Sequence, residues 1–190
     1  MDKFRRELEA FVRQVYEGER KVLVFGEGRA HARVMLVGEA PGEQEALQGR
    51  PFVGRAGKNL DRFLEDAGIA REALYLTNAV KFRPTRLSAA NRTVNRPPTQ
   101  EEIRLFAPWL WREIELVDPL CVVTLGNVPL RAVSGRALNI GGEHGRFFTL
   151  RGRDFFAMYH PASLIYNPSL RPTYAEDLRA LGEWLRTRQI

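Results

Sequence analysis

The sequence predicts an α/β fold built on a largely parallel central sheet. Three observations support this prediction: short apolar runs that end at turn residues, amphipathic segments between them, and the alternation of the two along the chain. Strands that alternate with helices favour parallel pairing, because each helix returns the chain to the same edge of the sheet. With 190 residues, 44% of them hydrophobic, the chain is long enough for one well-buried domain spanning 1–190.

In the first half of the chain, apolar residues at helical spacing over Phe4–Val15 predict an opening amphipathic helix. The apolar run Val34–Val37 ends at Gly38, which predicts a buried strand leading into a loop. A second apolar stripe predicts a helix that stops at Gly68; its members are Leu60, Phe63, Leu64 and Ala67. Ala73–Val80 then predicts the next strand.

In the second half, Thr99 and Glu102 stand at the spacing of a capping box and mark the start of a third helix. Its apolar stripe consists of Ile103, Phe106, Leu110, Ile114 and Val117. Leu120–Leu125 predicts another buried strand, and Tyr174–Arg188 predicts a closing helix. Two further runs flank a tight turn and predict a hairpin, namely Phe147–Leu150 and Phe155–Tyr159.

The composition narrows the class of protein. No apolar run reaches the length of a membrane span, and the first residues lack the apolar core of a signal peptide, so we expect a soluble, cytoplasmic protein. The lone cysteine, Cys121, excludes an internal disulfide and a cysteine cage for a metal within one chain. Because it lies in an apolar run, we interpret it as a small core residue.

The formal net charge of +6 favours a polyanionic partner, and its distribution is more informative than its size. Between Glu72 and Glu101 there is no acidic residue. The same stretch holds five basic residues, Lys81, Arg83, Arg86, Arg92 and Arg96. A solvated basic loop would explain them, but a long stretch of one sign suits a phosphate backbone better.

Three predicted strands end in polar residues that could share one pocket. They are Glu39, Asn78 and His160, a carboxylate, an amide and an imidazole. In open α/β sheets, ligands bind where loops leave the carboxyl ends of the strands. Taken singly, Glu39 could be a surface or capping carboxylate, Asn78 could satisfy backbone groups, and His160 could be a packing residue. Their joint placement favours a functional site.

Four ordered motifs carry a family resemblance: GEAPG at 38–42, GRPFVGRAG at 49–57, YLTNAVK at 75–81 and YHPASL at 159–164. With these motifs the chain resembles the uracil-DNA glycosylase superfamily, and specifically its family 4 branch, from Phe25 to the end. The resemblance implies a three-layer sandwich in which helices flank a central, largely parallel, four-stranded sheet. It also implies base excision from DNA.

The resemblance implies roles for individual residues. Glu39 lies in the loop that would hold the attacking water, and His160 would donate a hydrogen bond to uracil O2 as charge builds on the leaving base. Phe52 would stack on the flipped base, and the Asn78 amide would read its Watson–Crick edge, donating to O4 and accepting from N3–H. The remaining uracil contacts are assigned to Gly38, Ala40 and Gly42.

Contacts with DNA follow from the resemblance and from the basic stretch. Leu164 is a candidate wedge that enters the duplex where the base leaves, with Ser163 touching phosphate, although an exposed leucine in a loop is otherwise unremarkable. The predicted DNA-binding residues are Arg55, Lys81, Arg83, Arg86, Arg92, Asn95, Arg96, Ser163 and Leu164.

The chain departs from the family pattern in its cysteines. Family 4 relatives hold an iron–sulfur cluster through four cysteines, whereas Phe82 and Ala107 stand at two of those positions here and the amino-terminal pair is absent. We therefore expect no cofactor and no metal, and we hypothesise that these two residues supply apolar packing instead.

Two departures concern the chemistry. The best-known branch of the superfamily has aspartate at the position of Ala40, so the group that activates the water stays open. The loop Arg83–Pro98 resembles that of a variant branch that traps uracil-DNA covalently through a histidine. Asn95 falls at that position here, and an amide nitrogen is not a nucleophile, so we predict turnover or no reaction rather than trapping.

The sequence thus predicts a monofunctional, monomeric enzyme that removes uracil from uracil-containing DNA, with other deaminated bases as further candidate substrates. The alternative is a family member that binds DNA or the uracil site with weak or no catalysis. A metal-dependent nuclease fits poorly, because no acidic cluster suited to phosphodiester cleavage is present.

Overall fold

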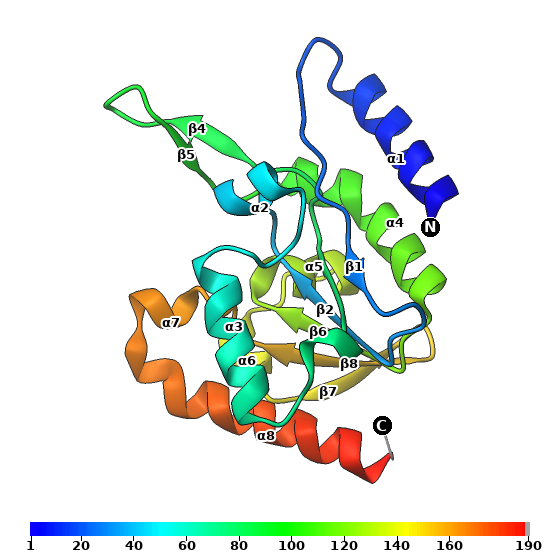
Figure 1. The fold of residues 1–190 in the computed structure, drawn as a ribbon, viewed down its shortest axis with the longest axis vertical. Helices are drawn as coiled ribbons and strands as arrows, with labels where there is room; N and C mark the ends of the chain where they lie inside the picture. Colours follow the sequence, from blue (N-terminus) through cyan, green and yellow to red (C-terminus); the bar gives the residue numbers. More distant parts are fainter. Residues whose placement is uncertain (189–190) are drawn as a thin grey trace.

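In the computed structural model, which describes residues 1–188, helices cover both faces of one central sheet (Figure 1). The sheet has the order β1-β3-β2-β6-β8-β7, and its strands are β1 (Glu27–Gly28), β2 (Val34–Gly38), β3 (Tyr75–Asn78), β6 (Cys121–Leu125), β7 (Phe147–Leu150) and β8 (Arg153–Met158). The four inner strands pair in parallel, as predicted. The short edge strands β1 and β7 pair antiparallel and extend the predicted four strands to six.

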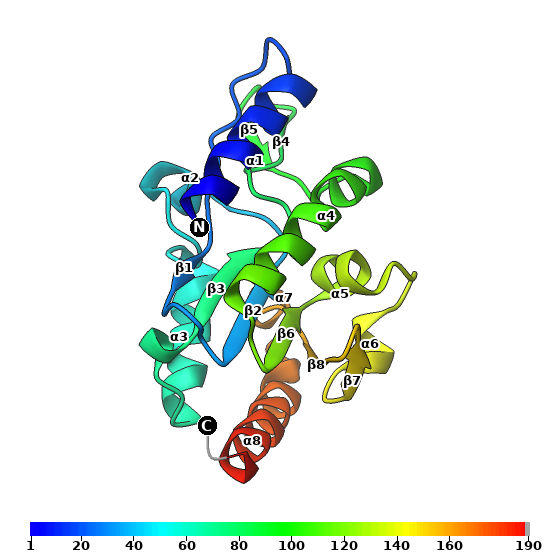
Figure 2. The same cartoon turned by 90° about the vertical axis from the view of Figure 1, so that its right-hand side faces the viewer.

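The helices form the two outer layers. One face of the sheet packs against α3 (Arg55–Asp66) and α8 (Arg171–Thr187), and the other against α4 (Gln100–Val117) and α5 (Asn127–Ser134) (Figure 2). The opening helix α1 (Asp2–Val15) lies outside this sandwich, against α4. The short helices are α2 (Glu43–Gln48), α6 (Ile140–Glu143) and α7 (Ser163–Tyr166), with the 3-10 turns η1 (Arg71–Ala73) and η2 (Pro168–Leu170).

Strand β2 shows how the core is divided. All five of its residues are buried, because helices cover both sides of a parallel sheet. Val34 and Leu36 point into the cluster shared with α3 and α8, while Met35 and Val37 point into the cluster shared with α4 and α5. Successive side chains of a strand alternate between its faces, so one apolar run serves both cores.

Several local predictions are confirmed. The third helix begins at a capping box in which the Thr99 hydroxyl accepts from the Glu102 amide (3.1 Å) and the Glu102 carboxylate accepts from the Thr99 amide (2.7 Å). The turn at Arg151 joins β7 and β8 as a hairpin. Cys121 is fully buried in β6. No helix within residues 1–188 is both long and apolar enough to cross a membrane.

The packing between α1 and α4 forms a separate, mostly aromatic core. Its buried members are Phe4, Leu8, Val12, Val80, Phe82 and Phe106, with Phe11, Tyr16 and Trp109 packed at its rim. We call this group the aromatic cluster. The Phe82 ring lies 5.2 Å from Tyr16 and 5.6 Å from Phe106 between centroids, in edge-to-face geometry. The aromatic cluster anchors α1 to the rest of the domain.

The predicted loop between residues 83 and 98 contains a second, two-stranded sheet. Strands β4 (Thr85–Leu87) and β5 (Thr93–Asn95) pair antiparallel, with Thr85 opposite Asn95. We call residues 83–96 the basic hairpin. It stands away from the domain above α2 (Figure 1), so most of its side chains face solvent.

Candidate active site

Two of the three polar strand ends, Asn78 and His160, share one cavity, whereas Glu39 lies beside it and is not part of its lining. A cavity of about 360 Å³ opens at the carboxyl edge of the parallel strands, and its lining includes Phe52, Asn78, Asn95 and His160. It also includes Ala40 and Gly42 of the loop that follows β2. This edge is where open α/β sheets bind ligands, because the loops leaving neighbouring strands meet there.

Gly38 allows two of these side chains to approach the loop closely. A Cβ at this position would lie 2.5 Å from Asn78 Oδ1 and 2.6 Å from Phe52 Cζ, which no side chain could tolerate. The absence of a side chain at Gly38 therefore brings the amide of Asn78 and the ring of Phe52 to one wall of the cavity. This explains physically why the loop begins with glycine.

Phe52 is held in an unusual backbone conformation. Its φ of 55° is left-handed, although it is not a glycine, and its ring is only 6% exposed. Two neighbours hold this turn. A Cβ at Gly57 would lie 1.9 Å from the Phe52 carbonyl oxygen, so glycine is required for this approach, and the Arg71 guanidinium donates to the Pro51 carbonyl (3.2 Å). The ring lies 6.4 Å from that of His160 between centroids, at 24° between planes.

Glu45 ties the two loops of the site together, and sequence reasoning missed it. Its carboxylate accepts from the backbone amide of Gly42 (3.1 Å) and from that of Gly54 (2.7 Å). Gly42 is the residue before α2, so Glu45 stands at the spacing of a capping box with glycine as its first member. That spacing was the available signal, but α2 itself was not predicted.

His160 is a neutral imidazole in this site. The Ala162 amide donates to its Nδ1 (3.1 Å), so Nδ1 is the acceptor and the ring proton lies on Nε2. Burial lowers the pKa of His160 to about 4, which keeps the ring uncharged at neutral pH. The site therefore offers a neutral N–H donor, with its tautomer selected by a backbone contact.

Glu39 is half-buried at the start of the loop that carries Gly42. Within residues 1–188 no protein group donates a hydrogen bond to its carboxylate, and burial raises its pKa. Its backbone is fixed nonetheless, because its carbonyl accepts from the Val80 amide (3.0 Å). A desolvated carboxylate without a donor is a stronger base than an exposed one, which suits it to take a proton from water.

The structure contradicts the DNA-binding role predicted for Lys81. Its side chain is completely buried, and its ammonium group donates to Thr77 Oγ1 (2.6 Å) and to the Asn78 carbonyl (2.7 Å) and pairs with the Glu113 carboxylate. It cannot reach a phosphate. Lys81 lies in the bend after β3, where its side chain turns inward to partners on β3 and α4, while the charge count alone suggested an exposed residue.

Two arginines of the basic hairpin are likewise engaged within the protein. Arg83 donates to Asn95 Oδ1 (2.6 Å) and pairs with Glu43 (3.2 Å), which docks the hairpin onto α2. Arg96 makes a two-pronged contact with Glu102 at the start of α4. Their predicted phosphate contacts are not supported, because both guanidinium groups hold the base of the hairpin in place.

The structure also contradicts the predicted wedge. Leu164 is 3% exposed and packs in the main core, because the segment after His160 forms the short helix α7 rather than an open loop. Ser163 is half-buried at the start of this helix. The exposed side chain on α7 is Tyr166, which is 87% exposed and lines the mouth of the cavity.

Four of the predicted DNA-binding residues are exposed: Asn95, to which Arg83 donates, and the three arginines Arg55, Arg86 and Arg92. Arg55 begins α3 beside the cavity, and Arg86 and Arg92 lie on the basic hairpin. No ion pair with another described residue holds any of them. Arg55 lines the cavity, while Arg86 and Arg92 lie farther out on the hairpin whose Asn95 lines it.

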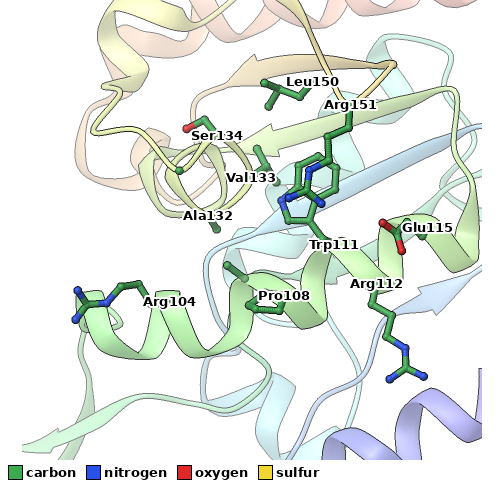
Figure 3. A pocket seen from close by; sticks show the side chains of 12 residues that line it. Arg104, Pro108, Trp111, Arg112, Glu115, Ala132, Val133, Ser134, Leu150 and Arg151 are labelled. Atoms are coloured by element: carbon green, nitrogen blue, oxygen red, sulfur yellow. The ribbon is translucent and has the colours of Figure 1, made fainter.

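A larger cavity lies elsewhere. It measures about 760 Å³ between α4, α5 and the β7–β8 turn, and Figure 3 shows the Arg151 side chain over the Trp111 ring, with 4.1 Å between guanidinium carbon and ring centroid. Arg112 points away from it, toward α1. This larger cavity contains none of the polar residues at the strand ends. We therefore identify the candidate active site by its residues and not by its volume.

Comparisons with known proteins show the family of this chain. Residues 25–183 match the family described as the uracil DNA glycosylase superfamily. The chain is 38% identical to the type-4 uracil-DNA glycosylase of Saccharolobus solfataricus, covering 90% of this chain and 80% of that protein. It is 37% identical to the type-4 enzyme of Thermotoga maritima (86% and 83% covered) and 34% identical to a type-5 uracil-DNA glycosylase of Pyrobaculum aerophilum (80% and 72% covered).

The residues present do not fit the iron–sulfur cluster of family 4. The chain has one cysteine, Cys121, which is buried in β6, and burial raises the pKa of its thiol to about 12. Phe82 belongs to the aromatic cluster, and Ala107 lies on α4. Among the described residues, no group of three or more histidine, cysteine or acidic side chains could hold a metal ion. No step of the chemistry is therefore routed through a cluster.

Proposed function

Because the chain belongs to the uracil DNA glycosylase superfamily, we propose that it hydrolyses the N-glycosidic bond of uracil in DNA and leaves an abasic site. One observation carries this proposal. The neutral imidazole of His160, with its proton on Nε2, shares one cavity with the Asn78 amide and the Phe52 ring. These are the groups needed to bind uracil and to stabilise the negative charge on the departing base.

Base recognition depends on Phe52 and Asn78. The flipped uracil stacks on the Phe52 ring, while the Asn78 amide donates to O4 and accepts from N3–H. Cytosine presents the opposite pattern at these two atoms, so it leaves both groups of a buried amide unpaired. The low exposure of Asn78, 4%, makes this mismatch costly because water cannot replace the lost bonds.

In the proposed cleavage of the N-glycosidic bond, His160 acts on the leaving base and Glu39 acts on the attacking water. The C1′–N1 bond cleaves and its electron pair leaves with uracil, whose O2 accepts a hydrogen bond from His160 Nε2–H. Water adds to C1′ of the oxocarbenium-like sugar and gives its proton to the Glu39 carboxylate. Both roles use the protonation states described above. Two other carboxylates line the cavity, but Glu43 pairs with Arg83 and Glu45 accepts from the Gly42 and Gly54 amides. Glu39 in the adjoining loop carries no such partner among the described residues, so it is the carboxylate assigned to take the proton.

DNA binds across the mouth of the cavity. Arg55, Arg86 and Arg92 contact phosphates on its two sides, and the exposed Tyr166 replaces the buried Leu164 as the side chain that fills the gap in the duplex. Asn95 lies in the cavity lining and carries no nucleophilic nitrogen, so the enzyme turns over without a covalent adduct. We further propose that it works as a monomer in the cytoplasm and needs no cofactor.

Excision of uracil from labelled oligonucleotides, followed by alkaline cleavage at abasic sites, tests the proposal. We expect cleavage of the uracil strand and a loss of about 10²–10³-fold in kcat in Asn78→Ala and in His160→Ala. An adduct that survives denaturing electrophoresis would contradict turnover. Binding of uracil-DNA without cleavage would favour the alternative of a binding protein.

A further inference from the structure

Directly beneath Asn78 lies a buried polar network that the chemistry above does not use. It consists of Tyr75, Thr77, Lys81 and Glu113, contributed by β3, by the segment after it and by α4. Thr77, Lys81 and Glu113 are fully buried, and Tyr75 is 5% exposed. We call these four residues the polar network. Buried charges are costly, so their presence in a core requires an explanation.

Every donor of the Lys81 ammonium group has a partner. An ammonium carries three N–H donors, and here they meet the Thr77 hydroxyl, the Glu113 carboxylate and the backbone carbonyl of Asn78. Burial lowers the pKa of Lys81, and the attraction of Glu113 opposes that shift. The third contact is the informative one, because the side chain reaches back three residues to the peptide group of the base-reading residue.

The carboxylate is held just as completely. Glu113 Oε1 accepts from the Tyr75 hydroxyl (3.0 Å), and Oε2 accepts from Thr77 (3.0 Å) as well as from Lys81. A Cβ at Gly26 would lie 2.6 Å from Glu113 Oε1 and 2.5 Å from the Tyr75 ring, so glycine is needed to close the network on its open side. A fully satisfied buried network has one geometry.

The backbone around Asn78 transmits that geometry to the site. Lys81 is itself anchored, because its carbonyl accepts from the Val24 amide (2.7 Å). At the other end of the same peptide group, the Ala79 amide donates to the Gly38 carbonyl (2.8 Å). The Lys81 ammonium therefore fixes the carbonyl of Asn78, and the next residue, Ala79, is bonded to Gly38 at the start of the loop 38–42.

We propose that Lys81 and Glu113 are positioning residues that orient the Asn78 amide for uracil recognition. The inference rests on the proposed function, since it presumes that Asn78 reads the base. An apolar pair would fill the same volume without holding a carbonyl, which is why a role in stability alone does not account for the contact between Lys81 and Asn78.

The test replaces the pair jointly, with Lys81→Met and Glu113→Leu in one variant, because removing both charges of a buried pair often preserves folding. The measurements are the melting temperature, kcat/KM, and binding to duplexes that carry either cytosine or a 2′-fluorinated deoxyuridine, whose glycosidic bond resists cleavage, because cytosine is the base whose edge the Asn78 amide rejects. The matched control is Asp177→Asn, which weakens a partly buried pair between Asp177 and His144 that contacts no residue of the site.

We expect the double variant to melt near the wild type, to lose about 10²-fold in kcat/KM and to lose about tenfold in preference for the uracil duplex. Adding Asn78→Ala should cause little further loss, because both changes act on the same contact. The Asp177→Asn control should keep the wild-type preference. A folded double variant with unchanged preference would overturn the proposal, as would losses that multiply with those of Asn78→Ala.

Two further outcomes keep the test decisive. If Asn78→Ala alone retains the preference for uracil, the proposed base-reading role fails, and the inference fails with it for that separate reason. If the double variant does not fold, Thr77→Val replaces it, since this change keeps both charges and removes the hydroxyl to which Lys81 donates. A loss of about two- to fivefold in preference supports the proposal, and no loss contradicts it.

Discussion

The aromatic cluster and the polar network are two cores built from one short stretch of chain. Val80 and Phe82 point into the aromatic cluster, whereas Lys81 between them points into the polar network. Helix α4 likewise serves both, with Phe106 on one side and Glu113 on the other. The chain alternates its side chains between two interiors of opposite character, so adjacent residues have opposite tolerance to change.

The difference teaches what each interior depends on. The aromatic cluster depends on buried area and shape, which several combinations of apolar residues supply equally well. The polar network depends on each partner, because removal of one leaves a buried charge or donor without compensation. The resemblance to family 4 places a cysteine at Phe82, so the tolerant interior is the one in which we expect this chain to depart from its family.

The largest expected effect breaks the polar network. Glu113→Gln keeps the shape of the side chain but leaves the buried Lys81 ammonium without a counter-charge. We expect a loss of about 3–5 kcal/mol in the free energy of unfolding, measured by urea denaturation. A loss below about 1 kcal/mol would show that the network tolerates change as well as the aromatic cluster does.

The next prediction concerns the loss of activity in acid, which we expect to follow the protonation of Glu39. Burial raises the pKa of Glu39 above its ordinary value and lowers the pKa of His160 to about 4, so Glu39 takes up its proton at the higher pH. Since only the carboxylate can accept a proton from water, kcat/KM should fall about tenfold per pH unit below the pKa of Glu39. A pH–rate profile measures this decline, which should disappear in Glu39→Gln; its persistence there would assign it to another group.

A smaller effect tests the tolerance of the aromatic cluster. Phe82→Leu keeps an apolar side chain in a fully buried position, so we expect a loss of about 1 kcal/mol in stability and unchanged uracil excision. Denaturation curves and the excision assay, run beside Glu113→Gln, measure the contrast directly. An activity loss in Phe82→Leu at full folding would show that the two interiors are coupled.

The smallest effect on stability is expected outside both interiors. Arg86→Ala with Arg92→Ala removes two exposed charges, and stability should change by no more than about 0.5 kcal/mol. DNA affinity should fall for all sequences alike, and the slope of log affinity against log salt should decrease by about 2. An unchanged slope would remove the hairpin from the DNA interface.

Much of the fold followed from local pattern. Buried strands such as Val34–Gly38 are continuous apolar runs that end at glycine, and the start of α4 is a capping box of two residues three apart. The convergence of Asn78 and His160 was predictable because parallel strands present their carboxyl ends at one edge. The short helices α2 and α7 were missed, because four to six residues carry too little periodicity to be recognised.

The sequence by itself determined the order of strands and helices along the chain and the three polar residues at the strand ends. It also determined the cysteine count, which does not fit a cluster. Only the tertiary structure decided which charges face water. Lys81 and Leu164 differ from exposed residues in no local feature, yet both are buried, since partners distant in sequence surround them. Burial depends on contacts between distant segments, and a local pattern of charge or spacing does not contain them.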